Sequence, residues 1–134
     1  MIVLDSSFLV AFLNTRDAHH RAAKVVVEGL VRGDWGPALL PEYVFLEVVT
    51  VLAARRSIEV AISAADVLLR AREVEFVPCS QYFLATLETF RREARFGLSF
   101  ADAAIVAVQR ARHAPYVATF DADFRKIAGV TVVP

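Results

Sequence analysis

Four acidic residues lie inside apolar runs or directly after them, where a carboxylate needs a specific reason to occur. Asp5 follows the run MIVL, and Asp121 follows VATF. Glu47 interrupts YVFLEVVTVLAA, and Asp102 lies in LSFADAAIVAV, three residues after Ser99. Because burying an unpartnered carboxylate is very costly, each of the four is either hydrogen-bonded locally or part of a shared charged site.

Each acid has a purely structural interpretation. Asp5 and Asp121 are placed to cap the helices that follow them. Asp102 is placed to be the reciprocal member of a capping box. We expect Glu47 to be buried, because its helix is apolar nearly all round, and a salt bridge to Arg55 or to the arginine after it would then serve as its partner. These interpretations remain open on the sequence alone.

The four acids together suggest a metal site. If the fold brings the two strand ends and the two helices together, four carboxylates share one pocket that has no matching cluster of bases. Oxygen ligands with retained waters select Mg²⁺, with Mn²⁺ as a substitute. His19 and His20 lie at the start of the second expected helix, and neither recurs with a second metal-binding residue. We therefore interpret both histidines as structural or solvated, and zinc is not favoured.

Short apolar runs alternate with longer amphipathic ones along the chain, which is typical of strands that alternate with helices. The first strand has no polar residue before Asp5, as in a central strand of a parallel sheet covered by helices on both sides. Ligands bind beyond the carboxyl ends of the strands in such sheets. We expect strands at 1–4, 37–40, 75–78, 116–119 and 130–133, and helices at 6–13, 17–32, 42–55, 60–72, 81–95, 99–112 and 121–127.

Composition bounds the remaining possibilities. The 134 residues fit one domain spanning 1–134. A hydrophobic content of 57% exceeds that of typical soluble domains, so a second copy or a partner covers some of the surface, unless the core is simply large. The net charge of zero opposes broad adhesion to nucleic acid, although arginine supplies 13 of the 15 basic residues and suits phosphate contacts. The absence of an 18-residue apolar run and the single cysteine, Cys79, predict no membrane association and a cytoplasmic location.

Together these motifs resemble the PIN domain family, and within it the VapC-like toxin ribonucleases of toxin–antitoxin pairs. The resemblance extends over essentially the whole chain, through IVLDSS, PEYVFLEVVTVL, LSFADAAIVAVQ and VATFDADF. It assigns the family's catalytic and metal-binding acids to four positions, namely Asp5, Glu47, Asp102 and Asp121. One ambiguity is Glu42 against Glu47, and the position of Glu47 deep in the apolar run favours the latter.

The resemblance also assigns supporting residues and partners. It gives Ser7 and Thr119 as supporting hydroxyls, Asp123 as a less constant fifth acid, and His20 as structural. It implies that the protein is a homodimer and is silenced by an antitoxin lying in a hydrophobic groove near the first helices. The exposed candidates for that partner-binding surface are Phe8, Leu9 and Phe12.

The implied fold is a three-layer α/β domain with a mainly parallel central sheet and helices on both faces. The implied activity is magnesium-dependent endonucleolytic cleavage of RNA, with one or two metal ions. Two alternatives remain: a PIN-like domain that binds RNA or a protein without cutting, and another magnesium-dependent α/β phosphotransfer enzyme. Because metal-free carboxylates at one site repel each other, asparagine at Asp5 or Asp102 is expected to leave the metal-free fold at least as stable.

Overall fold

Five parallel strands form the centre of the protein in a computed structural model, which describes all residues from 1 to 134. Their order across the sheet is β3-β2-β1-β4-β5, and every neighbouring pair is parallel. The predicted mainly parallel sheet is therefore confirmed, and it contains no antiparallel strand. The strands are β1 (Ile2–Leu4), β2 (Ala38–Pro41), β3 (Val74–Val77), β4 (Tyr116–Ala118) and β5 (Thr131–Val133).

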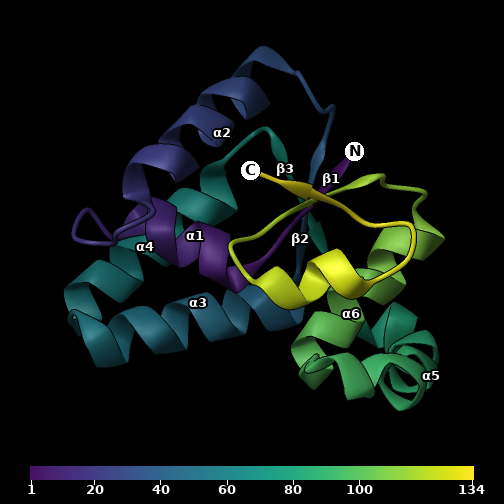
Figure 1. Cartoon of the computed structure of the whole chain (residues 1–134). Coiled ribbons are helices and arrows are strands. Elements are labelled where there is room, and N and C mark those ends of the chain that lie inside the picture. The colour runs from purple at the N-terminus through teal and green to yellow at the C-terminus, as the bar shows by residue number, and fades with distance from the viewer.

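Six α-helices cover the two faces of this sheet. The chain passes from β1 to β2 and on to β3 in one direction across the sheet and then crosses back to β4. Because such crossovers are right-handed, α1–α4 cover one face and α5 and α6 the other, as Figure 1 shows. The three-layer arrangement is confirmed. The helices are α1 (Ser6–Leu13), α2 (His20–Arg32), α3 (Glu42–Arg55), α4 (Ile58–Arg70), α5 (Phe83–Glu93) and α6 (Phe100–Ala111), with 3-10 turns η1 (Cys79–Tyr82), η2 (Ala94–Phe96) and η3 (Ala122–Lys126).

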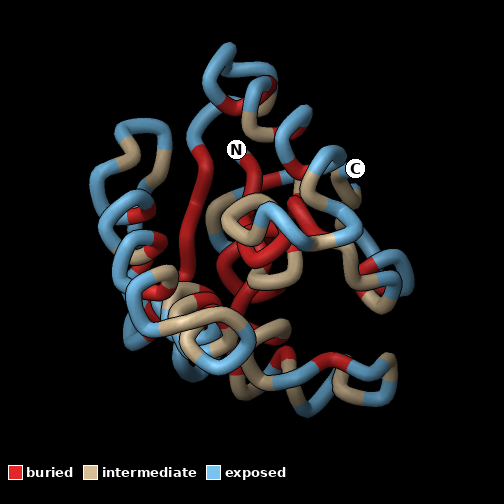
Figure 2. The backbone as a smooth tube through the Cα atoms, turned by 90° about the vertical axis from the view of Figure 1, so that its left-hand side faces the viewer, coloured by how far each residue is buried: buried red, intermediate tan, exposed pale blue.

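The hydrophobic core lies between the sheet and its helices. All residues of β1 and β2 are buried, and a buried run also fills the middle of α6. Figure 2 shows this buried backbone in the centre, surrounded by exposed helical turns. No helix combines the length and the apolar character that crossing a lipid bilayer requires.

Some element boundaries differ from the sequence prediction for local reasons. The second helix begins at His20 rather than residue 17, because the Asp17 carboxylate accepts the backbone N–H of His19 and forms a turn before the helix. The fourth helix begins two residues early, with Ser57 as its cap. The single helix expected at 81–95 is divided into η1, α5 and η2 and ends before Gly97, which has φ +97°.

Strands β2 and β3 are added on one side of β1, and β4 and β5 are added on its other side. At such a switch point the two neighbouring connections leave on opposite faces, so a crevice opens beyond the carboxyl ends of the strands. Asp5 directly follows β1, and Asp121 follows β4 by three residues. Because α3 begins immediately after β2, its first turns lie at this same edge. The sheet therefore directs three of its connections towards one crevice.

Candidate metal-binding site

Asp5 is the best-anchored acid at this edge. It is only 2% exposed, and its backbone N–H donates to the carbonyl of Ala118 in β4. Its side chain caps α1 by accepting the N–H groups of Ser6 (2.6 Å) and Ser7 (3.3 Å). A carboxylate in this position is stabilised by the free N–H groups and dipole of a helix start. The expected capping role is present, and it fixes the carboxylate at the crevice.

Two hydroxyls connect Asp5 to the loop after β4. The hydroxyls of Ser7 (2.6 Å) and Thr119 (2.7 Å) both donate to Asp5 Oδ2. Each hydroxyl also accepts a backbone N–H: Phe120 donates to Ser7 Oγ (3.0 Å) and Asp121 donates to Thr119 Oγ1 (2.9 Å). Because a hydroxyl has one proton to donate, Ser7 and Thr119 can both donate to Asp5 only if their own oxygens, 3.2 Å apart, are not hydrogen-bonded to each other. In that arrangement the network requires an acceptor at Asp5.

Asp102 lies in the first turn of α6, near Asp5 and Asp121. It forms the expected capping box with Ser99, whose N–H donates to Asp102 Oδ2 (2.7 Å) while Ser99 Oγ accepts the N–H of Asp102 (3.1 Å). Burial raises the pKa of the Asp102 carboxyl to about 6, and the negative charges of Asp5 and Asp121 contribute to the same increase. The structure therefore brings Asp5, Asp102 and Asp121 within electrostatic reach of one another.

Asp121 and Asp123 belong to the turn after β4. Asp121 caps η3, accepting the N–H of Asp123 on Oδ1 at 2.8 Å. The Asp123 carboxylate instead binds Lys126 (2.5 Å) and lies against Gly97. The side chain of Asp123 is thus occupied by a cation of its own, whereas Asp121 contributes to the field at Asp102.

Glu47 corrects one expectation. It is exposed rather than buried, because α3 presents Val44, Val48 and Leu52 to the core and turns Glu47 away from it. It forms no salt bridge with Arg55 or any other residue. The apolar residues all round α3 concealed which side faces the core.

Glu47 lines a groove of about 260 Å³ between α1 and α3, together with Ser6, Ser7 and Phe120. We call this hollow the α1–α3 groove. Glu42 lies elsewhere: its carboxylate accepts the N–H of Cys79 at the start of η1 (3.1 Å) and lines a different hollow. Only Glu47 of these two glutamates shares a cavity with the serines that contact Asp5.

The acidic side chains at the crevice offer the oxygen ligands that a hard divalent cation prefers. None of the four acids, Asp5, Glu47, Asp102 and Asp121, forms a salt bridge, so no cationic side chain balances their negative charge. All potential ligands are oxygens, as Mg²⁺ and Mn²⁺ prefer. In the present geometry no three acidic, histidine or cysteine side chains form a group close enough to hold a metal ion.

The expected partner-binding residues are only partly exposed, which corrects a second expectation. Phe8 and Leu9 are buried in the core, at 0% and 2% exposure, because α1 lies between the sheet and the neighbouring helices α2 and α3. Phe12 is half-buried. A hollow lined by all three runs between α1, α2 and α4, so Phe8 and Leu9 form its floor rather than an exposed surface.

The sequence did not identify His19 as part of the site. The His19 ring stacks on Phe120, with centroids 4.4 Å apart and an interplanar angle of 13°, and it lines the α1–α3 groove. Its neighbour His20 does have the expected structural contact, since His20 Nδ1 is hydrogen-bonded to the carbonyl of Ala11 (2.9 Å). Adjacent histidines carry no sequence signal that separates these two environments.

Comparisons with known proteins agree with this architecture. The PIN domain family model matches residues 2–130, whereas no curated protein sequence matches the chain. Among solved structures, the sarcin-ricin loop cleaving toxin VapC20 of Mycobacterium tuberculosis is 28% identical, with a TM-score of 0.85 over 100% of both chains. VapBC2 of Rickettsia felis, solved bound to a promoter DNA fragment, is 18% identical with a TM-score of 0.74 over 100% of both chains. A toxin–antitoxin complex from Klebsiella pneumoniae is 19% identical, with a TM-score of 0.68 over 98% of this chain and 96% of that one.

Proposed function

Because the chain belongs to the PIN domain family, we propose that it is a magnesium-dependent endoribonuclease and the toxin of a toxin–antitoxin pair. The similarity to VapC20, which cleaves the sarcin-ricin loop, supports RNA as the substrate. The observation that carries the proposal is the set of three aspartates at the switch point. Partial burial, with the negative charges of Asp5 and Asp121 adding to it, raises the pKa of Asp102, and no lysine or arginine forms a salt bridge with any of the three.

Each residue of the site has a proposed role. Asp5, Asp102 and Asp121 would hold the principal ion, and Glu47 would complete the site directly or through water. When bound, Mg²⁺ supplies Lewis acidity towards phosphate oxygens and makes water a stronger nucleophile. Asp5 is oriented by the hydroxyls of Ser7 and Thr119, and such supporting partners fix the direction in which a ligand oxygen points.

Cleavage of pooled RNA with and without chelator tests this proposal. We expect cleavage in magnesium or manganese and none in excess EDTA, because the site contains only carboxylate ligands. A generic phosphate ester serves as the second substrate, and turnover of the ester without turnover of RNA would indicate a phosphotransfer enzyme of another class. RNA cleavage that persists in excess EDTA would contradict the mechanism.

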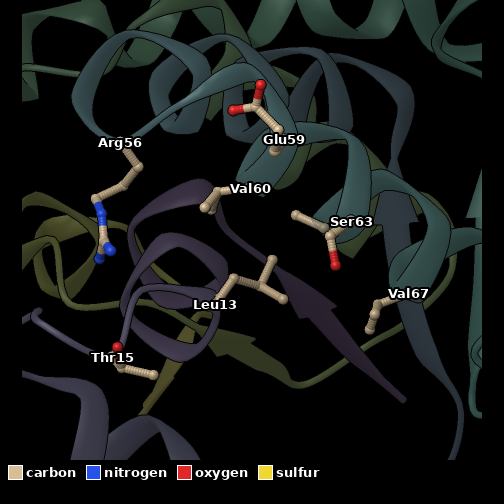
Figure 3. Close-up of a pocket in the computed structure, with 8 residues that line it drawn as sticks. Leu13, Thr15, Arg56, Glu59, Val60, Ser63 and Val67 are labelled. Carbon is tan, nitrogen blue, oxygen red and sulfur yellow. The ribbon is translucent and has the colours of Figure 1, made fainter.

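An antitoxin segment is the second partner that we propose. The hollow between α1, α2 and α4 continues into a larger one of about 400 Å³ beside α4, and the two share Val67. In Figure 3, Leu13 from the end of α1 faces Val60 and Val67 of α4 across this second hollow. The hollow between α1, α2 and α4 has almost entirely apolar walls, suited to the nonpolar side chains of a helix or extended segment. The hollow beside α4 adds polar groups, including Arg56 and Glu59, to an apolar strip. The likeness to a solved toxin–antitoxin complex supports an antitoxin as the partner, and the apolar lining of the hollows supports its placement.

We also propose that the protein is a homodimer. Leu46 of α3 and Phe83 of α5 line one hollow although both are strongly exposed, at 66% and 46%, and the neighbouring Leu84 is 78% exposed. Large apolar side chains clustered on a surface favour an interface. A second copy bound there would lie beside Glu47, which follows Leu46 directly in α3.

A further inference from the structure

The α1–α3 groove extends from the acidic site to side chains that the proposed metal chemistry does not use. Its lining includes Ser6 and Ser7, which contact Asp5, and also Asp17, His19 and Arg55. The groove is smaller than a typical drug-sized pocket and offers both a ring surface and hydrogen-bonding groups. This combination is suited to a single planar ligand beside the acidic site.

The His19 ring is held in place as the outer member of an aromatic stack. Phe8 in the core stacks on Phe120 with ring centroids 6.4 Å apart, and Phe120 stacks on His19. The turn that carries His19 is fixed on both sides: Asp17 Oδ1 accepts the His19 N–H (2.8 Å), and His20 is bonded to the Ala11 carbonyl. His19 is nevertheless exposed. A ligand can therefore stack on a ring that is already ordered, with little further loss of side-chain conformational entropy.

Two charged groups that line the groove have unused hydrogen-bonding capacity. Arg55 is exposed and forms no hydrogen bond or salt bridge through its side chain. Asp17 is half-buried, and only one of its two carboxylate oxygens accepts a hydrogen bond. A guanidinium pairs with the O6 and N7 acceptors of guanine, and a carboxylate accepts from the N1–H and N2–H₂ donors of the same base. No other RNA base offers both sets of groups.

We propose that the α1–α3 groove binds the base of a nucleotide adjacent to the scissile phosphate, stacked on His19 and read as guanine by Asp17 and Arg55. This inference rests on the proposed ribonuclease function and names a specificity site for it. Single-stranded bases are typically recognised by stacking on aromatic or histidine rings together with hydrogen bonds to their edges. The groove provides both within one cavity that also contains Glu47.

Binding of short RNAs without cleavage tests the inference. The probes are four fluorescein-labelled hexamers of uridine that carry G, A, C or U at the third position. Anisotropy is measured in magnesium on the Asp102→Asn protein, used here as the non-cleaving parent. We expect the guanine hexamer to bind tightest and His19→Ala to weaken it by about tenfold, as for the loss of one stacked base. His19→Phe keeps a ring and should stay within about twofold of the parent, since stacking tolerates any aromatic plane.

Two further variants distinguish a loss of guanine preference from a general loss of RNA binding. Asp17→Asn keeps the acceptor for the His19 N–H but loses the carboxylate, so it should reduce the preference for guanine without weakening the other hexamers. His113→Asn removes a histidine at the far end of α6 and tolerates the local φ of +51°, so it should bind like the parent.

Three outcomes would overturn the inference: equal binding by His19→Ala and the parent, equal binding of all four hexamers, or no binding of any hexamer to the parent. If the wild-type protein still cleaves pooled RNA in magnesium, only the guanine site is refuted. If wild type neither cleaves RNA nor binds the hexamers, the ribonuclease proposal falls as well.

Discussion

Replacing Asp102 by asparagine should stabilise the metal-free protein, and only above about pH 4. Burial raises the pKa of this carboxyl from 3.8 to about 6 in the folded protein, with Asp5 and Asp121 adding to the effect. The folded state therefore holds the proton more tightly than the unfolded state, so stability falls as the pH rises from 3.8 to 6. Asparagine has no charge to lose and keeps an oxygen that accepts the Ser99 N–H in the capping box.

The structure also sets the size of the effect. The shift in pKa corresponds at full strength to about 3 kcal/mol, but Asp102 is only partly buried, and solvent screening reduces this to about 1 to 2 kcal/mol. For a chain of 134 residues, 1 kcal/mol corresponds to about 3 to 4 °C in Tm. The variant should therefore melt about 3 to 8 °C above wild type at pH 7.5 in EDTA.

Thermal unfolding of both proteins in EDTA, followed by circular dichroism from pH 4 to pH 8, measures this difference. The two melting temperatures should coincide near pH 4, diverge up to about pH 6 and stay apart above it. Added magnesium should raise the wild-type Tm and leave the variant unchanged. A variant that melts below wild type at pH 7.5 would refute the reasoning, because it would mean that the carboxylate stabilises the fold.

The other predictions concern Asp5, assembly and the antitoxin groove. Asp5→Asn should lower the Tm in EDTA, because its NH₂ group would face either the Ser6 N–H or the Ser7 and Thr119 hydroxyls, which are all donors to Asp5. The mismatch should cost about 1 to 3 kcal/mol. An unchanged Tm would show that the two hydroxyls can turn to accept a hydrogen bond from the amide. Light scattering should give a dimer mass for wild type and a monomer mass for Leu46→Glu, and a monomeric wild type contradicts the dimer. Val67→Asp should prevent co-purification of a co-expressed antitoxin while RNA cleavage persists, and retained co-purification would place the partner elsewhere.

That Asp5 and Asp121 lie at one edge of the sheet was predictable from the sequence. Asp5 ends the first apolar run and Asp121 follows the fourth, and the carboxyl ends of parallel strands meet at one edge. The capping interpretation was also correct for Asp5, Asp102 and Asp121. Capping and ligand roles are compatible, because each carboxylate oxygen has more than one lone pair and the cap fixes the direction of the carboxylate.

The features that sequence alone could not determine depend on tertiary packing. The sides of α1 and α3 that face the core cannot be identified when apolar residues surround the helix, so Glu47 was expected to be buried and Phe8 and Leu9 to be exposed. The hydrogen bonds of Thr119 to Asp5 and Ser7 join residues more than 100 positions apart in the sequence. Because of this network we now expect asparagine at Asp5 to destabilise the metal-free fold, whereas the expectation for Asp102 is unchanged.

The central claim is that a metal held by these aspartates cleaves RNA. Its most direct test is the rate of RNA cleavage by wild type and Asp102→Asn at saturating magnesium, because this variant is expected to be at least as stable as wild type without metal. We predict a loss of more than about 100-fold, beyond that typical of residues that only support a metal ligand, in a protein that circular dichroism shows to be folded. Cleavage by folded Asp102→Asn at the wild-type rate would contradict the claim.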